Sequence, residues 1–95
     1  MYTHVVLFHL NDPQDAAEAV ARLEAMVGRI PALRALEAGV DDAPSDRSAH
    51  VCLITRFDDA DGLEAYRVHP VHQELLAWMK PRVARSIKVD FAGEP

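Results

Sequence analysis

Two segments of this chain are apolar on both faces when they are placed in β-strand geometry, and this feature constrains the fold more than any other. Residues 2–10 (YTHVVLFHL) and 49–57 (AHVCLITRF) are rich in β-branched and aromatic side chains. A strand whose two alternating sets of side chains are both apolar has to be covered on both sides. We therefore predict that these segments are the central strands of one sheet.

The remaining segments predict two helical regions and two further strands. Asp12 and Pro13 begin a helix whose apolar side chains recur every three to four residues and which ends near Gly28. Pro70 interrupts the second helical region, because proline removes a backbone donor. The expected elements are strands at 2–10, 33–40, 49–57 and 85–91, a helix at 13–28, and helical segments on either side of His69–Pro70, the second at 71–79.

The order βαββαβ is that of a ferredoxin-like α+β sandwich with a four-stranded antiparallel sheet, in the strand order 4-1-3-2. Two helices can cover only one face of such a sheet, and the other face is apolar as well. The side chains expected on the uncovered face are Val5, Leu7, Val51, Leu53 and Phe57. A second copy of the chain, packed sheet against sheet, is the simplest cover, so we expect a homodimer.

Length and charge argue against several other kinds of protein. The chain has 95 residues, which is enough for one domain. Its net charge of −5 argues against nucleic acid or an anionic membrane as a partner, because both require a basic surface. The single cysteine, Cys52, allows no intrachain disulfide, and residues 1–11 lack the features of a signal peptide. We expect a cytoplasmic protein.

Four short runs together resemble one protein family. They are His4–Phe8 (HVVLF), Thr55–Asp58 (TRFD), Tyr66–His72 (YRVHPVH) and Lys88–Phe91 (KVDF), and the Y-x-x-H-P-x-H run is the most specific of them. The chain resembles the stress-responsive A/B barrel domain family over a domain at residues 2–92. The resemblance implies ferredoxin-like protomers that pair across a two-fold axis into a dimeric α/β barrel. It implies no cofactor.

One branch of this family suggests a chemical site. A plant polyketide cyclase of the family closes a ring by an aldol-type condensation without any cofactor. The resemblance implies that Tyr66 and His72 match its functional tyrosine and histidine, and that His4 and His50 match the histidines that begin two of its strands. The chain departs from that enzyme in the first helix, where aliphatic side chains replace aromatic ones.

The expected topology also brings these polar groups together. If the first and third strands are parallel neighbours about 4.8 Å apart, His4 and His50 share one end and one face of the sheet. The second helical region runs back toward that end with His72 and Tyr66. We therefore predict a cavity with a polar end. Its wall is expected to comprise Val6, Phe8, Val20, Leu23, Cys52, Ile54, Leu63, Leu76 and Trp78.

Two other interpretations of the histidines have to be weighed. In the first, they are structural plugs at the end of the barrel, each hydrogen-bonded to the backbone, as buried polar groups usually are. In the second, His69 and His72 bind a metal ion through their three-residue spacing. No carboxylate or cysteine stands at a matching interval, so we expect no zinc site.

Two functions remain compatible with the sequence. The first is a small homodimeric protein that binds a hydrophobic small molecule in an internal cavity. The second is a cofactor-free enzyme, either a cyclase-like lyase or a monooxygenase of the antibiotic-biosynthesis type. In that enzyme, His72 is the general base and Tyr66 donates a hydrogen bond to the developing enolate oxygen.

Overall fold

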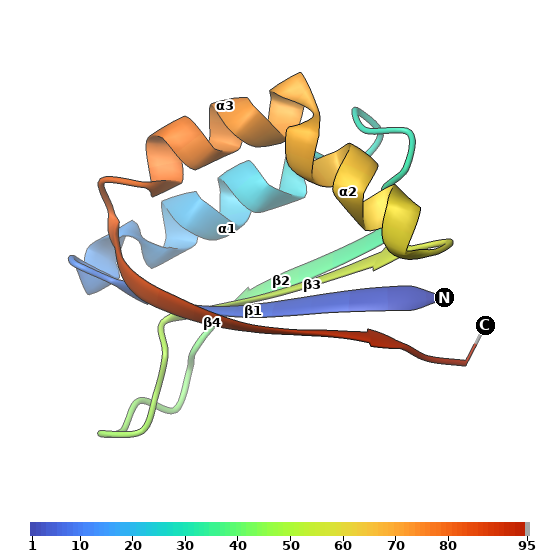
Figure 1. Ribbon diagram of the computed structural model, residues 1–95. Helices are drawn as coiled ribbons and strands as arrows, with labels where there is room; N and C mark the ends of the chain where they lie inside the picture. The colour runs from blue at the N-terminus through green and yellow to red at the C-terminus, as the bar shows by residue number, and fades with distance from the viewer. Residues whose placement is uncertain (95) are drawn as a thin grey trace.

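The computed structural model describes residues 1–94, which form a sheet with a layer of helices on one face (Figure 1). The elements are β1 (Tyr2–Leu10), the 3-10 turn η1 (Pro13–Asp15), α1 (Ala16–Glu24), β2 (Ala35–Val40), β3 (Val51–Phe57), α2 (Ala60–Val68), α3 (Pro70–Met79) and β4 (Val83–Ala92). The predicted ferredoxin-like α+β fold is confirmed. No helix in residues 1–94 has the length and apolar character needed to cross a membrane.

The strand order is β2-β3-β1-β4, and each neighbouring pair is antiparallel. The expected order is therefore confirmed, but the expectation that β1 and β3 are parallel neighbours is wrong. The crossover through α1 makes β1 and β2 parallel to each other, and the loop after β2 then reverses the chain. β3 lies between those two strands, so it runs opposite to both, with Val6 facing Leu53 and His4 facing Thr55.

The first helical region begins as its capping residues predict. The Asp12 side chain accepts a hydrogen bond of 2.9 Å from the Gln14 amide, and Pro13 follows as the first residue of η1. The regular helix ends at Glu24 and continues as turns. Gly28 ends these turns with a φ of +81°, a backbone conformation that favours glycine.

His69 and Pro70 separate α2 from α3, as the sequence predicts (Figure 1). The residue before a proline avoids helical geometry, and His69 takes a φ of −67° and a ψ of 139°. Its ring then caps α3, because Nδ1 accepts a hydrogen bond of 3.1 Å from the Val71 amide. The interruption therefore begins a new helix rather than ending the helical layer.

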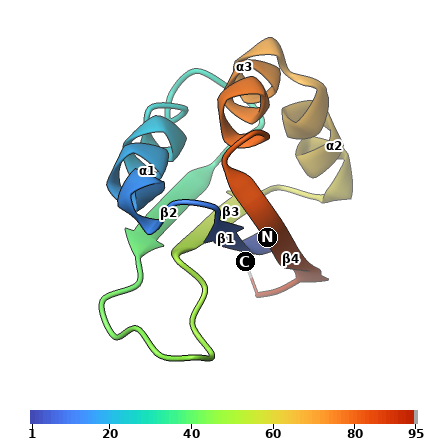
Figure 2. The same ribbon diagram turned by 90° about the vertical axis from the view of Figure 1, so that its left-hand side faces the viewer.

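The core lies between the helices and one face of the sheet (Figure 2). β3 supplies Val51, Leu53, Thr55 and Phe57 to this core, and none of them is more than 3% exposed. The expectation that Val51, Leu53 and Phe57 lie on the uncovered face is wrong. Alternation shows which side chains of β3 share a face, but only the register with β1 shows which of the two faces the helices cover.

The opposite face of the sheet has no helix over it (Figure 2). The outward side chains of β4 are largely exposed: Ile87 at 62%, Val89 at 61% and Phe91 at 47%. We call this surface the bare face and define it by Val5, Leu7, Cys52, Ile54, Ile87, Val89 and Phe91. An apolar surface of this kind marks an interaction site.

Candidate functional site

A cavity of about 620 Å³ lies between the helix-covered face of the sheet and the helices α2 and α3. Exposed Ser86 and Lys88 of β4 line it, so it opens along that edge of the sheet. Its apolar wall consists of Val6, Phe8, Leu23, Leu53, Ala60, Leu63, Leu75, Leu76 and Met79. Its polar lining consists of His4, Glu64, Tyr66, Arg67, His72, Ser86, Lys88 and Asp90.

The break between α2 and α3 fixes the position of His72. The last carbonyls of a helix lack partners within that helix. Here the Arg67 carbonyl accepts hydrogen bonds from His72 Nδ1 at 3.0 Å and from the Gln73 side chain at 2.6 Å. The interruption at Pro70 thus provides the acceptor that orients the imidazole.

This hydrogen bond also sets the tautomer of His72. A carbonyl only accepts, so Nδ1 carries the proton and Nε2 keeps its lone pair in the neutral ring. Burial lowers the pKa of His72 below its usual 6.5, and nearby His4 and Arg67 lower it further. The hydrogen bond to the Arg67 carbonyl raises the pKa, but this effect is smaller than that of burial. His72 is therefore held in the form that accepts a proton at Nε2.

Tyr66 presents a buried hydroxyl that has no hydrogen-bond partner within residues 1–94. The residue is 1% exposed, and its ring packs 5.1 Å from that of Phe57 and 4.3 Å from that of His72. Burial raises the pKa of the phenol, so the hydroxyl remains a donor. A buried polar group without a partner costs about 1–3 kcal/mol, and the cavity is where a partner has room to bind.

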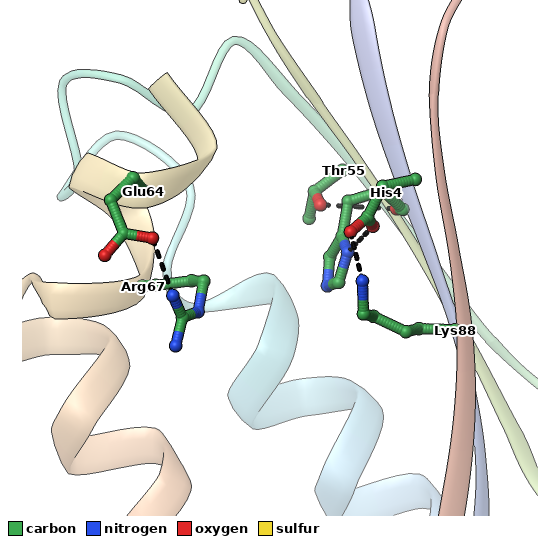
Figure 3. Close-up of polar contacts among 6 residues, drawn as sticks. His4, Thr55, Glu64, Arg67 and Lys88 are labelled. Carbon is green, nitrogen blue, oxygen red and sulfur yellow. Dashed lines mark hydrogen bonds and ion pairs between the residues drawn. The ribbon is translucent and has the colours of Figure 1, made fainter. Parts of the chain in front are cut away.

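The sheet side of the cavity contains a small charged cluster (Figure 3). His4 Nδ1 bonds to the Asp90 carboxylate, and Lys88 donates to the other oxygen of Asp90. The Thr55 hydroxyl donates to the His4 carbonyl at 3.4 Å, from the neighbouring strand. Because the carboxylate accepts the Nδ1 proton, the neutral His4 ring keeps its lone pair on Nε2.

Asp90 is a site residue that the sequence reasoning missed. Burial by itself raises the pKa of its carboxyl group, but the hydrogen bonds from Lys88 and His4 outweigh this and hold the pKa below 3.8. The alternation of polar and apolar side chains along β4 could have identified it. Lys88 and Asp90 share a phase opposite to that of Ile87 and Val89, so they point toward the helices.

His50 does not join this site, and the predicted convergence of three histidines is wrong. Because β1 and β3 are antiparallel, the start of β3 lies beside Phe8 and Leu10, at the far end of β1 from His4. His50 Nδ1 accepts a hydrogen bond of 2.8 Å from the Leu10 amide. This bond to the backbone matches the structural interpretation for His50. Its ring centroid lies 6.0 Å from that of His9.

The predicted apolar wall is correct in some members and wrong in others. Val6, Phe8, Leu23, Leu63 and Leu76 line the cavity as expected. Cys52 and Ile54 do not, because they alternate with the buried side chains of β3 and lie on the bare face. Val20 packs against the core away from the cavity, and Trp78 stacks between Arg22 at 4.6 Å and Arg82 at 4.2 Å.

The interpretation of His69 and His72 as a metal pair finds no support in the geometry. His69 Nδ1 is engaged as the cap of α3, and His72 Nδ1 bonds to the Arg67 carbonyl. Within residues 1–94, no group of three or more histidine, cysteine or acidic side chains is arranged to hold a metal ion. The polar lining therefore offers proton donors and acceptors to a ligand.

Comparison with known proteins places this geometry in a family. The family model described as the Stress responsive A/B Barrel Domain matches residues 2–92. A search of curated proteins found no match. A dimeric ferredoxin-like protein of unknown function from Thermobifida fusca is 29% identical, with a TM-score of 0.84 over 96% of this chain and 89% of that chain.

Two further solved structures have the same fold. A dimeric ferredoxin-like protein of unknown function from Bacteroides fragilis is 24% identical, with a TM-score of 0.84 over 95% of this chain and 93% of that chain. The hydroxynitrile lyase from Passiflora edulis is 11% identical, with a TM-score of 0.79 over 95% of this chain and 90% of that chain. At these identities, the likeness shows the fold alone.

Replacing Asp90 by asparagine tests the charged cluster. We expect Asp90→Asn to lower the free energy of unfolding by about 1–2 kcal/mol at about pH 7, because two charge-assisted hydrogen bonds are weakened. The folded pKa of Asp90 is lowered, so its contribution is present above the unfolded pKa near 3.8 and is lost as the pH falls through the folded pKa. Urea unfolding at fixed protein concentration, from neutral to acidic pH, measures the difference. The exposed-loop variant Asp42→Asn is the control, and an equal loss in both variants would contradict the prediction.

Proposed function

Because the chain belongs to the stress responsive A/B barrel domain family, we propose that it is a homodimer whose protomers each bind a hydrophobic small molecule in the internal cavity. The observation that carries the proposal is the Tyr66 hydroxyl, which is buried beside a largely apolar cavity and has no hydrogen-bond partner among residues 1–94. A ligand with an apolar body and one hydrogen-bond acceptor satisfies both features.

The bare face supports the homodimer. Three of its exposed side chains on β4, Ile87, Val89 and Phe91, are apolar, and the similar proteins from Thermobifida fusca and Bacteroides fragilis are dimeric. Removing apolar surface from water contributes roughly 25 cal/mol per Å². A specific interface buries about 800 Å² on each partner, and the outward face of a four-stranded sheet is of that order. Packing two bare faces together thus removes Ile87, Val89 and Phe91 of each protomer from water.

The composition of the cavity supports a hydrophobic ligand. Its volume of about 620 Å³ lies within the range of roughly 300–1,000 Å³ that is usual for small-molecule sites. Leucine, valine, phenylalanine and methionine account for eight of the nine apolar residues that line it. The polar groups gather near His4 and Tyr66, so a bound molecule has one polar end and an apolar remainder. Specificity then comes from a few hydrogen bonds and binding energy from apolar contact.

A second candidate function is cofactor-free proton abstraction, and the tautomer of His72 favours it. The lone pair on Nε2 removes a proton from a carbon next to a carbonyl group, and the electron pair moves onto the carbonyl oxygen. The Tyr66 hydroxyl then donates a hydrogen bond to that oxygen. His4 is positioned by Asp90 to hold the substrate from the sheet side. A lyase of the same fold exists in Passiflora edulis, so the architecture is compatible with catalysis.

Narrowing the cavity mouth tests ligand binding. Ser86 is exposed at the opening, so we expect Ser86→Trp to reduce affinity for the fluorescent probe anilinonaphthalene sulfonate at least about tenfold. The matched control is Ala65→Trp, on an exposed part of α2 that does not line the cavity. Fluorescence titration measures both dissociation constants. Equal binding by the two variants would place the probe elsewhere and contradict binding in the cavity.

Proton abstraction is tested with acetone in deuterated buffer, where exchange of its methyl protons is followed by NMR. We expect wild-type exchange to rise with pH along a titration curve whose midpoint lies below pH 6.5, because the pKa of His72 is lowered and the neutral ring is the base. His72→Asn retains a donor for the Arg67 carbonyl but has no base, so exchange should fall at least ~100-fold. His9→Asn, outside the cavity, should have no effect. Wild-type exchange at the buffer rate would exclude this second function and leave ligand binding in place.

A further inference from the structure

The bare face carries a groove at one end. The loop between β2 and β3 extends from the sheet on the side opposite the helices (Figure 2). Beneath it lies a groove of about 260 Å³, whose floor includes Leu7, Gly39 and Cys52 of three adjacent strands. Asp41, at the start of the loop, forms part of its rim. The absence of a side chain at Gly39 helps to keep this floor open, since nothing lies within 4 Å of the position of its missing Cβ.

The same face carries a projecting side chain at its other end. Phe91 is 47% exposed and pairs with Thr3, whereas Leu7 pairs with Ile87 four residues earlier on β4. The groove and Phe91 therefore lie at opposite ends of one face and on different strands. The Phe91 ring leans over Gly93, where an added Cβ would come within 3.4 Å of the ring. About half of the surface of Phe91 remains exposed, so this aromatic side chain has apolar area left to bury against a partner.

We propose that Phe91 of each protomer inserts into the groove of its partner, beneath the partner's β2–β3 loop. This inference rests on the homodimer proposed above. In a two-fold dimer the same patch serves both protomers, so if Phe91 of one protomer enters the partner's groove, the partner's Phe91 enters the groove of the first. A two-fold axis that lies in the interface and runs obliquely across the strands makes this exchange. The two Phe91 side chains then occupy two equivalent grooves.

The same axis pairs the charges within this face. We place the residues on a flat lattice, with strands about 4.8 Å apart and residues about 3.4 Å apart along each strand. The axis that superposes Phe91 on the groove then passes close to Val5 and Leu7 of β1. It carries Arg56 of β3 onto the partner's Glu37 in β2, and Glu37 onto the partner's Arg56.

This charge pairing is independent of the argument from shape. Glu37 and Arg56 lie on the bare face, because they pair with Ile54 and Ala35, respectively, in the outward phase of β2 and β3. Covering an unpaired charge is costly, and an opposite charge beside it offsets part of that cost. The axis is defined only by the positions of Phe91 and the groove, yet it brings Glu37 of one protomer to Arg56 of the other. The two observations thus favour one arrangement of the dimer.

Cross-linking through the native cysteine tests the position of Phe91. Cys52 lines the groove, and within one protomer it lies two strands away from Phe91 and at the opposite end of the sheet. Facing sheets are about 10 Å apart, too far for a disulfide, so a short bifunctional thiol reagent such as dibromobimane is suitable. We expect Phe91→Cys to give a covalent dimer whose linked peptides contain residues 52 and 91. Phe91→Cys combined with Cys52→Ser should give none.

Arg85→Cys is the matched control, because it is also an outward position of β4 but lies at the other end. The proposed axis carries it beyond the partner's sheet, so no link to Cys52 is expected. A charge exchange tests the same arrangement with Phe91 intact. Glu37→Arg or Arg56→Glu alone should raise the dimer dissociation constant about tenfold, and the two together should restore it.

The outcomes separate this inference from the homodimer itself. Gel filtration with light scattering is run on each variant before the reagent is added. A dimer that forms no link between residues 52 and 91, and whose dissociation constant does not respond to the charge exchange, would overturn the seating of Phe91 and leave the homodimer standing. A wild-type monomer would overturn the homodimer first, and the inference with it.

Discussion

The architecture depends on one constraint: the sheet has two apolar faces, and the chain supplies helices for only one of them. Val51, Leu53 and Phe57 are buried because they point toward α1, α2 and α3, while Ile87 and Val89 stay exposed on the other side. None of the helices in residues 1–94 lies over that second face (Figure 2). We therefore propose that a second copy covers this face, and dissociation of such a dimer would return its apolar side chains to water.

The cavity follows from a second local constraint, the interruption at Pro70. A continuous helix would satisfy the Arg67 carbonyl within its own hydrogen-bond ladder and leave His72 without an anchor. The break frees that carbonyl, and the imidazole bonds to it with Nδ1. Across the cavity, Asp90 orients His4 in the same way. Two imidazoles oriented through Nδ1 and the Tyr66 hydroxyl, which has no hydrogen-bond partner within residues 1–94, make this end of the cavity polar.

Much of the fold was predictable from the sequence, because hydrophobic alternation and the proline signals are local. The strand order and the break at His69–Pro70 followed from these signals. The failures concern register, which is not local. A strand that is apolar on both faces, such as β3, gives no indication of which set is covered, so the prediction puts Cys52 and Ile54 on the wrong face. The prediction for His50 fails because β3 runs antiparallel to β1, which puts this residue at the other end of the sheet from His4. Asp90 was missed because its partner, His4, is 86 residues away in the sequence.

The most direct test of the account measures mass in solution as the bare face is disrupted. Gel filtration coupled to light scattering should give wild-type protein twice the protomer mass of 10.5 kDa. Val89→Lys, which puts a charge on the bare face, should give the protomer mass. Val27→Lys, at a similarly exposed valine in the turns after α1, should leave the dimer intact. A wild-type protein that runs at 10.5 kDa at micromolar concentration would contradict the account.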